Sequence, residues 1–414
     1  MTRMKESANL WMKTIPNDWQ EMKLRYLVNL RSEKAKTTDS NVYVGMENII
    51  SNIGEYIPTE IQVDNAENIS FNKGDILFGK LRPYLRKYWL ATFSGTASSE
   101  FLVFKESALN KKFLYWMIQS DSFINDVDSS TYGSKMPRAS WDYIRNIVVP
   151  FPSSDEEQNK IADFLDKKVT QLDKAKSLLE EQIQKLAAYR QSLIYETVTK
   201  GLDKTAPMKD SGVDWIGQVP EGWGVTKVSN YFIEVKNKNI GNREDNLLSL
   251  SYGSIKRKSN TNLMGLLPES FETYNIIEAN DIVFRLTDLQ NDKKSLRTGL
   301  SLERGLITSA YVTIRAINKQ TNSKYYHYLF HAYDICKVFY SFGGGVRQGG
   351  SFSDLSELQI VLPNVEEQLK IADFLDQKIS QINQMIDIKQ KQIENINQQR
   401  QTLIYDYVTG KRRV

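Results

Sequence analysis

EEQNKIADFLD occupies residues 156–166, and EEQLKIADFLD, the same motif with a single change, occupies residues 366–376. The similarity continues without a gap, so that 156–199 aligns with 366–409 with 21 identities in 44 positions. A shorter repeat lies upstream of each copy, where WMKTIPNDW at 11–19 matches WIGQVPEGW at 215–223. The chain is therefore an internal duplication in which a globular region and a helix each occur twice.

The two repeated segments have the apolar spacing of long helices, with steps of four and three residues sustained over about four heptads. One such helix would ordinarily be read as a dimerisation coil, but two copies on one chain favour pairing within the chain. Because only a short linker joins the first helix to the second globular region, we expect an antiparallel pair with a pseudo-twofold axis. The expected seam residues are Leu165, Val169, Leu172, Leu179, Ile183, Leu186 and Leu193, and Leu375, Ile379, Ile382, Ile386, Ile393, Ile396 and Leu403.

The globular regions alternate short apolar runs, typical of strands, with aromatic-rich stretches typical of helices. The fold class that this pattern predicts is α+β, or mixed α/β, with two globular domains joined by an intramolecular antiparallel coiled coil. Strands are predicted at 75–81, 101–105, 146–152, 281–286, 310–316 and 359–363, and helices at 111–126 and 324–339. The predicted boundaries are 1–152 for the first domain, 153–200 for its helix, 201–214 for a linker, 215–363 for the second domain and 364–414 for its helix.

The composition is that of a globular protein, with 41% apolar residues and one cysteine, Cys336, so no disulfide framework is expected. The N-terminal segment lacks the apolar core of a secretory signal, and no run has the length of a membrane span. We therefore expect a cytoplasmic protein without membrane contact. The net charge of +4 is mildly basic and is weak support for an anionic partner.

Several basic segments have the residue types that bind nucleic acid. GKLRPYLRKYW at 79–89 contains four basic residues, interleaved with aromatic rings and without an acid, and Pro83 predicts a strand followed by a loop. Guanidinium and ammonium groups suit phosphates, and Arg and Gln also suit base edges, although a solvated basic loop has the same composition. The candidate DNA-binding residues are Lys80, Arg82, Tyr84, Arg86, Lys87, Lys135, Arg138, Lys256, Arg257, Lys258, Gln290, Lys293, Arg347 and Gln348.

Motifs for catalysis are poor. His327 and His331 have the i, i+4 spacing of helical metal ligands, but aromatic packing explains them better. The triplet EVK at 234–236 has the form of a nuclease Asp/Glu-x-Lys, which arises by chance in a charged chain. Cys336 is expected in a core rather than as a nucleophile. No catalytic residue, metal ligand or cofactor is predicted.

These motifs together resemble the specificity subunit of type I restriction-modification systems over the whole length. The resemblance is carried by IPNDW and VPEGW, by GDILFGKLRPYLRK and by the twinned helices that end in RQSLIYETVT and RQTLIYDYVT. It implies two target-recognition domains that each read half of a bipartite double-stranded DNA site, and helices that set the spacer and dock two methyltransferase subunits. Restriction–translocase subunits would complete the complex. The partner-binding positions that it implies on the helices are Ile161, Phe164, Tyr195, Ile371, Phe374 and Tyr405.

Three alternatives stay open at the level of sequence. The chain is compatible with a recognition subunit that serves a methyltransferase without a nuclease. It is compatible, less well, with a self-contained nuclease built on Asp281 or Glu234. A coiled-coil scaffold without DNA affinity is the weakest of the three. The second domain has FRLTDLQNDKK where the first has FGKLRPYLRK, which predicts different half-sites.

Overall fold

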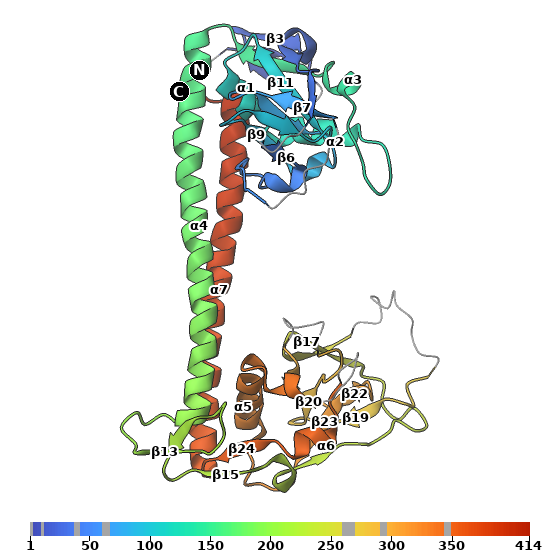
Figure 1. Cartoon of the computed structure of the whole chain (residues 1–414), viewed down its shortest axis with the longest axis vertical. Coiled ribbons are helices and arrows are strands. Elements are labelled where there is room, and N and C mark those ends of the chain that lie inside the picture. Colours follow the sequence, from blue (N-terminus) through green and yellow to red (C-terminus); the bar gives the residue numbers. More distant parts are fainter. Residues whose placement is uncertain are drawn as a thin grey trace. The chain divides into compact units, whose positions relative to one another are not determined.

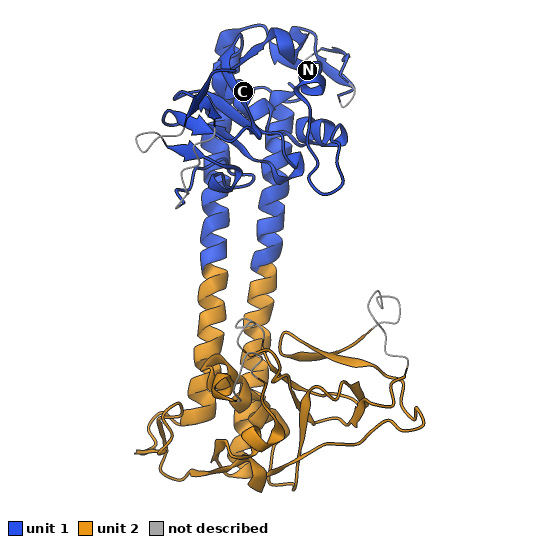
Figure 2. Ribbon diagram, turned by 45° about the vertical axis from the view of Figure 1, so that its right-hand side comes forward, with its two compact units in different colours: residues 1–181, 389–414 blue, residues 182–388 orange. Residues whose placement is uncertain are grey.

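The computed structural model describes residues 3–9, 12–36, 42–59, 67–258, 270–289, 296–342 and 349–414. The chain divides into two compact units, shown in Figure 2: unit 1 comprises 1–181 and 389–414, and unit 2 comprises 182–388. Two long helices, α4 (Asp155–Lys200) and α7 (Val365–Val408), each contribute to both units. Among the described residues, no helix has the apolar length needed to cross a membrane.

Unit 1 contains a mixed set of short strands and helices before α4 (Figure 1). Its strands are β1 (Met4–Glu6), β2 (Thr14–Pro16), β3 (Trp19–Lys23), β4 (Val28–Leu30), β5 (Lys34–Lys36), β6 (Tyr43–Val44), β7 (Glu67–Phe71), β8 (Ile76–Gly79), β9 (Tyr88–Leu90), β10 (Gly95–Ala97), β11 (Phe101–Ser107) and β12 (Val148–Pro152). Its helices are α1 (Lys111–Met117), α2 (Asp121–Ser129) and α3 (Trp141–Ile144), with 3-10 turns η1 (Leu24–Tyr26), η2 (Met46–Asn48) and η3 (Pro83–Leu85).

The central sheet of unit 1 has the order β4-β11-β8-β9 and is antiparallel. Because side chains alternate along a strand, β8 serves two cores. Ile76 and Phe78 pack with α1, α2 and the first turns of α4, whereas Leu77 packs in a smaller core with residues of the sheet β5-β7-β10-β6. The predicted strands at 75–81, 101–105 and 146–152 are thus confirmed as β8, β11 and β12.

Unit 2 repeats this plan. Its strands are β13 (Met208–Asp210), β14 (Gln218–Pro220), β15 (Gly224–Lys227), β16 (Phe232–Glu234), β17 (Leu248–Ser251), β18 (Ser254–Arg257), β19 (Asn275–Ile277), β20 (Ile282–Phe284), β21 (Thr298–Leu300), β22 (Gly305–Ile307), β23 (Val312–Ala316) and β24 (Gln359–Leu362). Its helices are α5 (Ser323–Ile335) and α6 (Phe352–Ser356), with 3-10 turns η4 (Val228–Asn230) and η6 (Val338–Ser341).

The central sheet of unit 2, β16-β23-β20-β21, has the same strand order as its counterpart in unit 1. Ile282 and Phe284 of β20 face the core formed with α5, α4 and α7, and Val283 faces a separate small cluster. The predicted strands at 281–286, 310–316 and 359–363 are confirmed as β20, β23 and β24. The duplication in sequence is therefore a duplication of topology.

The boundaries of the two helices predicted in the globular regions differ from the observed ones. The stretch 111–126 is divided into α1 and α2, because Ser120 caps α2 by accepting a hydrogen bond from the backbone N–H of Phe123 at 3.4 Å. The stretch 324–339 is α5 followed by a 3-10 turn. Cys336 ends α5 and is exposed, so the expectation that it lies in a core is wrong.

The pairing of α4 with α7 is antiparallel within unit 1. Phe164 stacks on Tyr407 with ring centroids 4.5 Å apart, and further along α4 the Asp173 carboxylate lies 3.3 Å from Nε of Arg400. As the number rises on α4, it falls on α7, as in an intramolecular antiparallel coiled coil. Arg400 is only 5% exposed, and its guanidinium also donates to Gln119 at 3.3 Å.

Unit 2 has the matching contact between the same two helices. Arg190 of α4 donates to Oδ1 of Asn383 of α7 at 2.6 Å. In the alignment of the repeats, Arg190 corresponds to Arg400 and Asn383 corresponds to Asp173. The same cross-helix layer thus occurs in both units, once as an ion pair and once with a neutral amide. A polar layer of this kind favours one helix register over the alternatives.

Candidate nucleic-acid interface

The repeated EEQ motif fastens each globular part to its long helix. Glu157 accepts a hydrogen bond from the indole N–H of Trp19 at 3.3 Å, and Glu367 accepts one from Trp223 at 2.9 Å. These tryptophans are the last residues of the IPNDW and VPEGW motifs. In each unit, the tryptophan motif therefore contacts the EEQ motif.

The glutamine that follows is buried in both copies. Gln158 accepts from the backbone N–H of Asn110, the N-cap of α1, at 2.8 Å and donates to the carbonyl of Pro152 at 3.0 Å. Gln368 accepts from the N–H of Asn322, the N-cap of α5, at 2.8 Å and donates to Pro363 at 2.9 Å. Each glutamine therefore ties the start of a domain helix to the end of the preceding strand.

The last acid of the motif completes this attachment. Asp166 lies 2.8 Å from Nζ of Lys112 and accepts from the Trp116 indole at 2.7 Å. In unit 2, Asp376 makes the equivalent pair with Lys324 at 3.0 Å and accepts from the hydroxyl of Tyr328 at 2.6 Å. The resemblance implied that this motif contacts a partner. Three of its polar residues in each copy instead make contacts inside their own unit: Glu157, Gln158 and Asp166, and Glu367, Gln368 and Asp376.

The basic segment at 79–89 forms a strained turn. Arg82 and Arg86 both have the left-handed backbone, with φ of 49° and 52°, and they flank the single 3-10 turn η3. Non-glycine residues in this region cost free energy that the surrounding structure must offset, and such strain gathers at functional sites. The turn presents Tyr84, which is 51% exposed, while Pro83 beneath it is buried.

A second segment, distant in sequence, lies against this turn. The backbone N–H of Arg82 donates to the carbonyl of Pro137 at 2.7 Å, and its guanidinium donates to the carbonyl of Lys135 at 2.8 Å. An isolated bridge also joins Leu81 to Arg138. The structure thus brings together the predicted residues of 80–86 and of 135–138.

We call the resulting region the basic–aromatic surface. Its polar members are Lys80, Arg82, Lys135 and Arg138, and its exposed apolar and aromatic members are Tyr84, Tyr132 and Met136. Tyr132 is 65% exposed and Met136 is 47% exposed. Sequence reasoning had missed both, because nothing in the local pattern shows that these side chains stay outside a core.

Two of the arginines predicted to bind DNA form ion pairs with acidic side chains of the same unit. Arg138 makes a bidentate pair with Glu100, at 2.9 Å from Nη2 and 3.1 Å from Nε, and this carboxylate raises the pKa of Arg138. Nη2 of Arg86 lies 2.5 Å from the Asp121 carboxylate at the start of α2. Lys87 donates to the carbonyl of Ile49, and desolvation lowers its pKa. Arg138, Arg86 and Lys87 are therefore held by partners inside unit 1, whereas Lys135 is exposed.

In unit 2 the predicted basic residues that are described lie on β18 or directly after it, as Lys258 does. Lys256 and Lys258 are exposed, and Arg257 pairs with Glu303 through Nε at 2.8 and 2.9 Å, which raises the pKa of Arg257. The other four candidates in this half lie outside the described residues: Gln290, Lys293, Arg347 and Gln348. The structure therefore assembles a candidate surface in unit 1 and only part of one in unit 2.

The six helix positions expected to bind a partner fall into two groups. Ile161 and Ile371 are fully buried in the cores of their own units, so a partner does not reach their side chains, and this expectation is corrected. Phe164, Tyr195, Phe374 and Tyr405 are half-buried. Tyr195 donates from its hydroxyl to the carbonyl of Trp215 at 3.1 Å.

The two acids considered for nuclease chemistry are each paired with a cation: Glu234 lies 2.7 Å from Nζ of Lys236, and Asp281 pairs with Arg315. Asp281 is 1% exposed and accepts two hydrogen bonds from Arg315, both at 2.7 Å. His327 and His331 lie on α5, and burial lowers their pKa values to about 3 and about 4. Within the part of the chain that the structure describes, no three His, Cys, Asp or Glu side chains gather as metal ligands.

Comparison with known proteins matches these features to one family. A relative from Methanocaldococcus jannaschii, the putative type I restriction enzyme MjaX specificity subunit, is 24% identical over 66% of this chain and 60% of its own length. The EcoDI specificity subunit of Escherichia coli is 22% identical over 48% of this chain and 44% of its own length. The chain thus spans less than two thirds of these two relatives. The MjaIX specificity subunit of M. jannaschii is 21% identical over 97% of this chain and 95% of its own length.

Solved structures share the fold. A chain from a structure described as the basis of complex assembly and conformational transition of the type I R-M system aligns with a TM-score of 0.72 at 17% identity, over 96% of this chain and 99% of that one. The HsdS subunit from Thermoanaerobacter tengcongensis aligns with a TM-score of 0.52 at 18% identity, over 96% and 98%. Residues 16–187 and 220–398 each match the family described as the type I restriction modification DNA specificity domain, and the chain belongs to this family, with two copies of its domain.

Proposed function

We propose that this chain is the DNA-recognition subunit of a type I restriction-modification complex. Each globular domain reads one half of a bipartite double-stranded DNA site. The basic–aromatic surface of unit 1 is the observation that carries this proposal, because it joins cations for phosphates to exposed rings on a strained, well-anchored turn. Family membership supports a non-catalytic role for the chain itself.

The proposed partners follow from the duplicated helices. Two methyltransferase subunits dock on the chain, and restriction–translocase subunits complete the complex and carry out cleavage. The domain limits proposed from sequence are kept, with recognition domains at 1–152 and 215–363, helices at 153–200 and 364–414, and a linker at 201–214. Limited proteolysis tests these limits, since first cleavage within the linker is expected.

DNA binding by the chain in its methyltransferase complex tests the recognition surface. Lys135→Ala removes an exposed cation, so we expect weaker binding and a salt slope smaller by about one unit. Arg86→Ala breaks an internal ion pair, so affinity falls through loss of loop order and the salt slope changes less. Lys174→Ala, an exposed lysine on α4, is the matched control and leaves both quantities unchanged.

Two results would contradict the proposal. If Lys135→Ala and Lys174→Ala had the same affinity and the same salt slope as the unmodified chain, the surface would be a solvated loop. If methylome sequencing found no sequence motif that is methylated by the complex, the recognition role itself would fail. The alternative of a methyltransferase without a nuclease is separated by asking whether a restriction subunit copurifies with the complex.

A further inference from the structure

The hairpin of β17 and β18 has a bulky residue in a turn that disfavours one. Its two-residue loop consists of Tyr252 and Gly253, with φ of 47° and 78°. Hairpin loops with positive φ at both residues have the type I′ pattern, in which Asn-Gly is the preferred pair. An aromatic residue at positive φ is an outlier, because its side chain is crowded by the backbone. The fold therefore holds Tyr252 in a conformation that this residue type opposes.

Packing does not explain the choice of this residue. The Tyr252 side chain is 83% exposed, so it contributes little to a core. For the turn alone, asparagine would serve better than tyrosine. Strained residues that persist without a packing role gather at functional sites. The ring is therefore a candidate for contact with another molecule.

The inner face of the hairpin is anchored on unit 2. Leu248 and Ile255 pack in the small core that contains Val283 of β20. Leu250 pairs with Ile255 across the hairpin, and both lie over Gly299 of β21, where a Cβ would come within 2.6 Å of Cδ1 of Leu250. The close approach at Gly299 seats the hairpin firmly on the central sheet.

The outer face of the hairpin consists of hydroxyl groups and a cation. Ser251 pairs with Ser254, and Ser249 pairs with Lys256. Because alternate residues of a strand point to opposite faces, these four side chains share the face away from the core. Ser254 and Lys256 are exposed, and the other two serines are half-buried. No acid occurs in the sequence from 247 to 258, so this face suits a polyanion.

The dimensions of the hairpin match the major groove of B-DNA. That groove is about 12 Å wide and about 8.5 Å deep, and it admits a two-stranded β-ribbon. The two strands of a ribbon lie about 4.8 Å apart. Lys256 is four residues from Tyr252, which is about 13 Å along a strand. With the ring at the floor of the groove, the Lys256 ammonium group would therefore lie at the level of the phosphates.

Unit 1 has a different element at the corresponding place. Its strand β6 pairs in parallel with β10, and in unit 2 Leu247, directly before β17, pairs in parallel with Leu306 of β22. After β6 the chain enters the 3-10 turn η2, whereas after β17 it turns back as β18. Two domains that read different half-sites need different reading elements on one scaffold, and this divergence agrees with that need.

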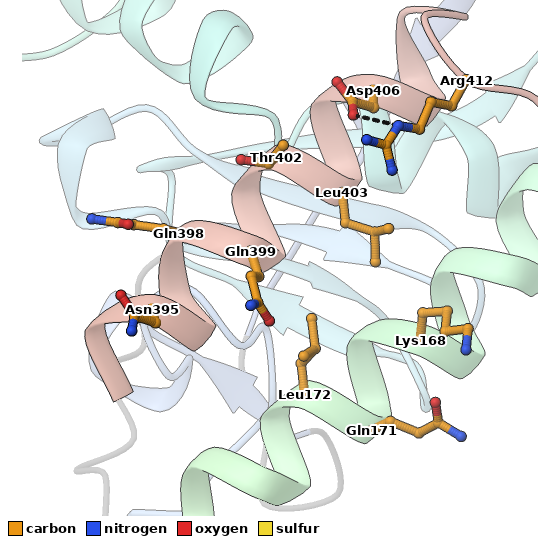
Figure 3. A pocket seen from close by; sticks show the side chains of 10 residues that line it. All are labelled: Lys168, Gln171, Leu172, Asn395, Gln398, Gln399, Thr402, Leu403, Asp406 and Arg412. Atoms are coloured by element: carbon orange, nitrogen blue, oxygen red, sulfur yellow. Dashed lines mark ion pairs between the residues drawn. The ribbon is translucent and has the colours of Figure 1, made fainter. Parts of the chain in front are cut away.

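The groove between α4 and α7 in unit 1 is a weaker candidate for contact with bases (Figure 3). It has a volume of about 720 Å³, and none of the ten side chains drawn in Figure 3 is aromatic. Its basic side chains are Lys168 and Arg412, and Arg412 is paired with Asp406 at 3.1 Å. The hairpin, by contrast, combines an exposed ring with hydroxyl groups and cations.

We propose that the β17–β18 hairpin enters the major groove of the DNA and that Tyr252 is a specificity-determining residue for the second half-site. This inference rests on the proposed function and names the element with which unit 2 reads DNA. The ring packs against base edges, where a thymine methyl group suits its apolar surface, and its hydroxyl hydrogen-bonds to a base. Ser251 and Ser254 place further hydroxyl groups beside the ring, and Lys256 binds a phosphate.

The test replaces Tyr252 by the residue that the turn prefers. Tyr252→Asn removes the ring and relieves the backbone strain, so unit 2 should keep or gain amide protection from hydrogen exchange. Tyr252→Phe keeps the ring and removes only the hydroxyl. Lys256→Ala removes the proposed phosphate contact. The matched control is Tyr26→Asn, at a tyrosine of unit 1 that is 62% exposed.

Each variant is purified in complex with its methyltransferase subunit, and the site is taken from methylome sequencing of the unmodified complex. Binding is measured on duplexes with the intact site and with single base changes in either half. Tyr252→Asn should weaken binding to the intact site at least about tenfold and reduce discrimination in the second half-site alone. Tyr252→Phe should retain more of this discrimination than Tyr252→Asn. Lys256→Ala should weaken binding to all duplexes alike and reduce the salt slope by about one unit.

Three results would separate the possible failures. If Tyr252→Asn had the affinity and discrimination of the Tyr26→Asn control, the hairpin would not be the reading element. If Tyr252→Asn lost the methyltransferase subunit in native mass spectrometry, the ring would serve a protein contact, and the inference would be wrong. If the unmodified complex had no site preference, the proposed function itself would fail.

Discussion

Replacement of Gln368 by Met removes the buried amide at the start of α7 while keeping the length of the side chain. Gln368 is fully buried. Its amide accepts from the N–H of Asn322 at 2.8 Å and donates to the carbonyls of Pro363 at 2.9 Å and Gln320 at 3.3 Å. Gln368→Met leaves these backbone groups without their partner and changes little else in shape.

The expected cost follows from the number of groups left unpaired. A buried donor or acceptor without a hydrogen bond costs about 1–3 kcal/mol. The Pro363 carbonyl bears the full cost, and the Asn322 N–H, at a half-buried residue, bears a part of it. The thioether recovers about 1 kcal/mol through apolar burial. With about half of that cost for the Asn322 N–H, we expect unit 2 to lose about 2 kcal/mol, within a range of about 0.5–3.5 kcal/mol. The central value is an increase of about 30-fold in its opening equilibrium.

Amide hydrogen exchange read by mass spectrometry measures this effect separately in each unit. Gln381→Met, an exposed glutamine on the same helix, is the control and should change stability by no more than about 0.5 kcal/mol. Gln158→Met makes the equivalent change in unit 1 and should open that unit selectively.

The reasoning would be refuted by either of two results. In the first, the Gln368→Met and Gln381→Met variants have the same amide protection from hydrogen exchange. In the second, Gln368→Met or Gln158→Met lowers amide protection equally in both units. The first result would mean that the amide contacts do not stabilise unit 2. The second would mean that the motif does not act within its own unit.

Three further predictions concern pH, helix register and helix length. Burial lowers the pKa of His327 to about 3 and that of His331 to about 4, whereas a histidine of the unfolded chain has a pKa near 6.5. Between these values the unfolded chain binds more protons than the folded one, so unit 2 should be stable above pH 6.5 and lose stability as the pH falls below it. Urea unfolding between pH 4 and 8 measures this loss, and a stability that did not fall with pH would contradict it. Burial raises the pKa of Asp173, and Arg400→Leu removes the cation that stabilises its charged form. Because Asp173 is more fully charged at pH 8 than at pH 5, unit 1 should lose more stability at pH 8. An equal loss at the two pH values would contradict this. One heptad inserted after Ile183 and a second inserted after Ile393 lengthen each helix by about 10 Å. In methylome sequencing, the unspecified spacer of the DNA site should then grow by about three base pairs while the half-sites persist. An unchanged spacer would contradict this prediction.

The sequence by itself determined the duplicated architecture. The gapless repeat and the apolar steps of four and three predicted two long helices, and the short linker predicted their antiparallel pairing. Short continuous apolar runs likewise located the strands β8 and β20 of the two central sheets. These features follow from local periodicity, because a helix or a strand places its apolar residues at intervals that are visible along the chain.

Only the tertiary structure decided which surface each helix residue faces. An apolar or polar position at helical spacing has the same pattern whether it contacts its own domain or a foreign partner, so Ile161 and Gln158 were indistinguishable from docking residues until their surroundings were known. The same holds for the basic–aromatic surface. Arg86 and Arg138 read as free cations in sequence, but acids distant in the chain, Asp121 and Glu100, pair with them in the fold. Such pairs depend on which segments the core brings together, and no local pattern along the chain carries that information.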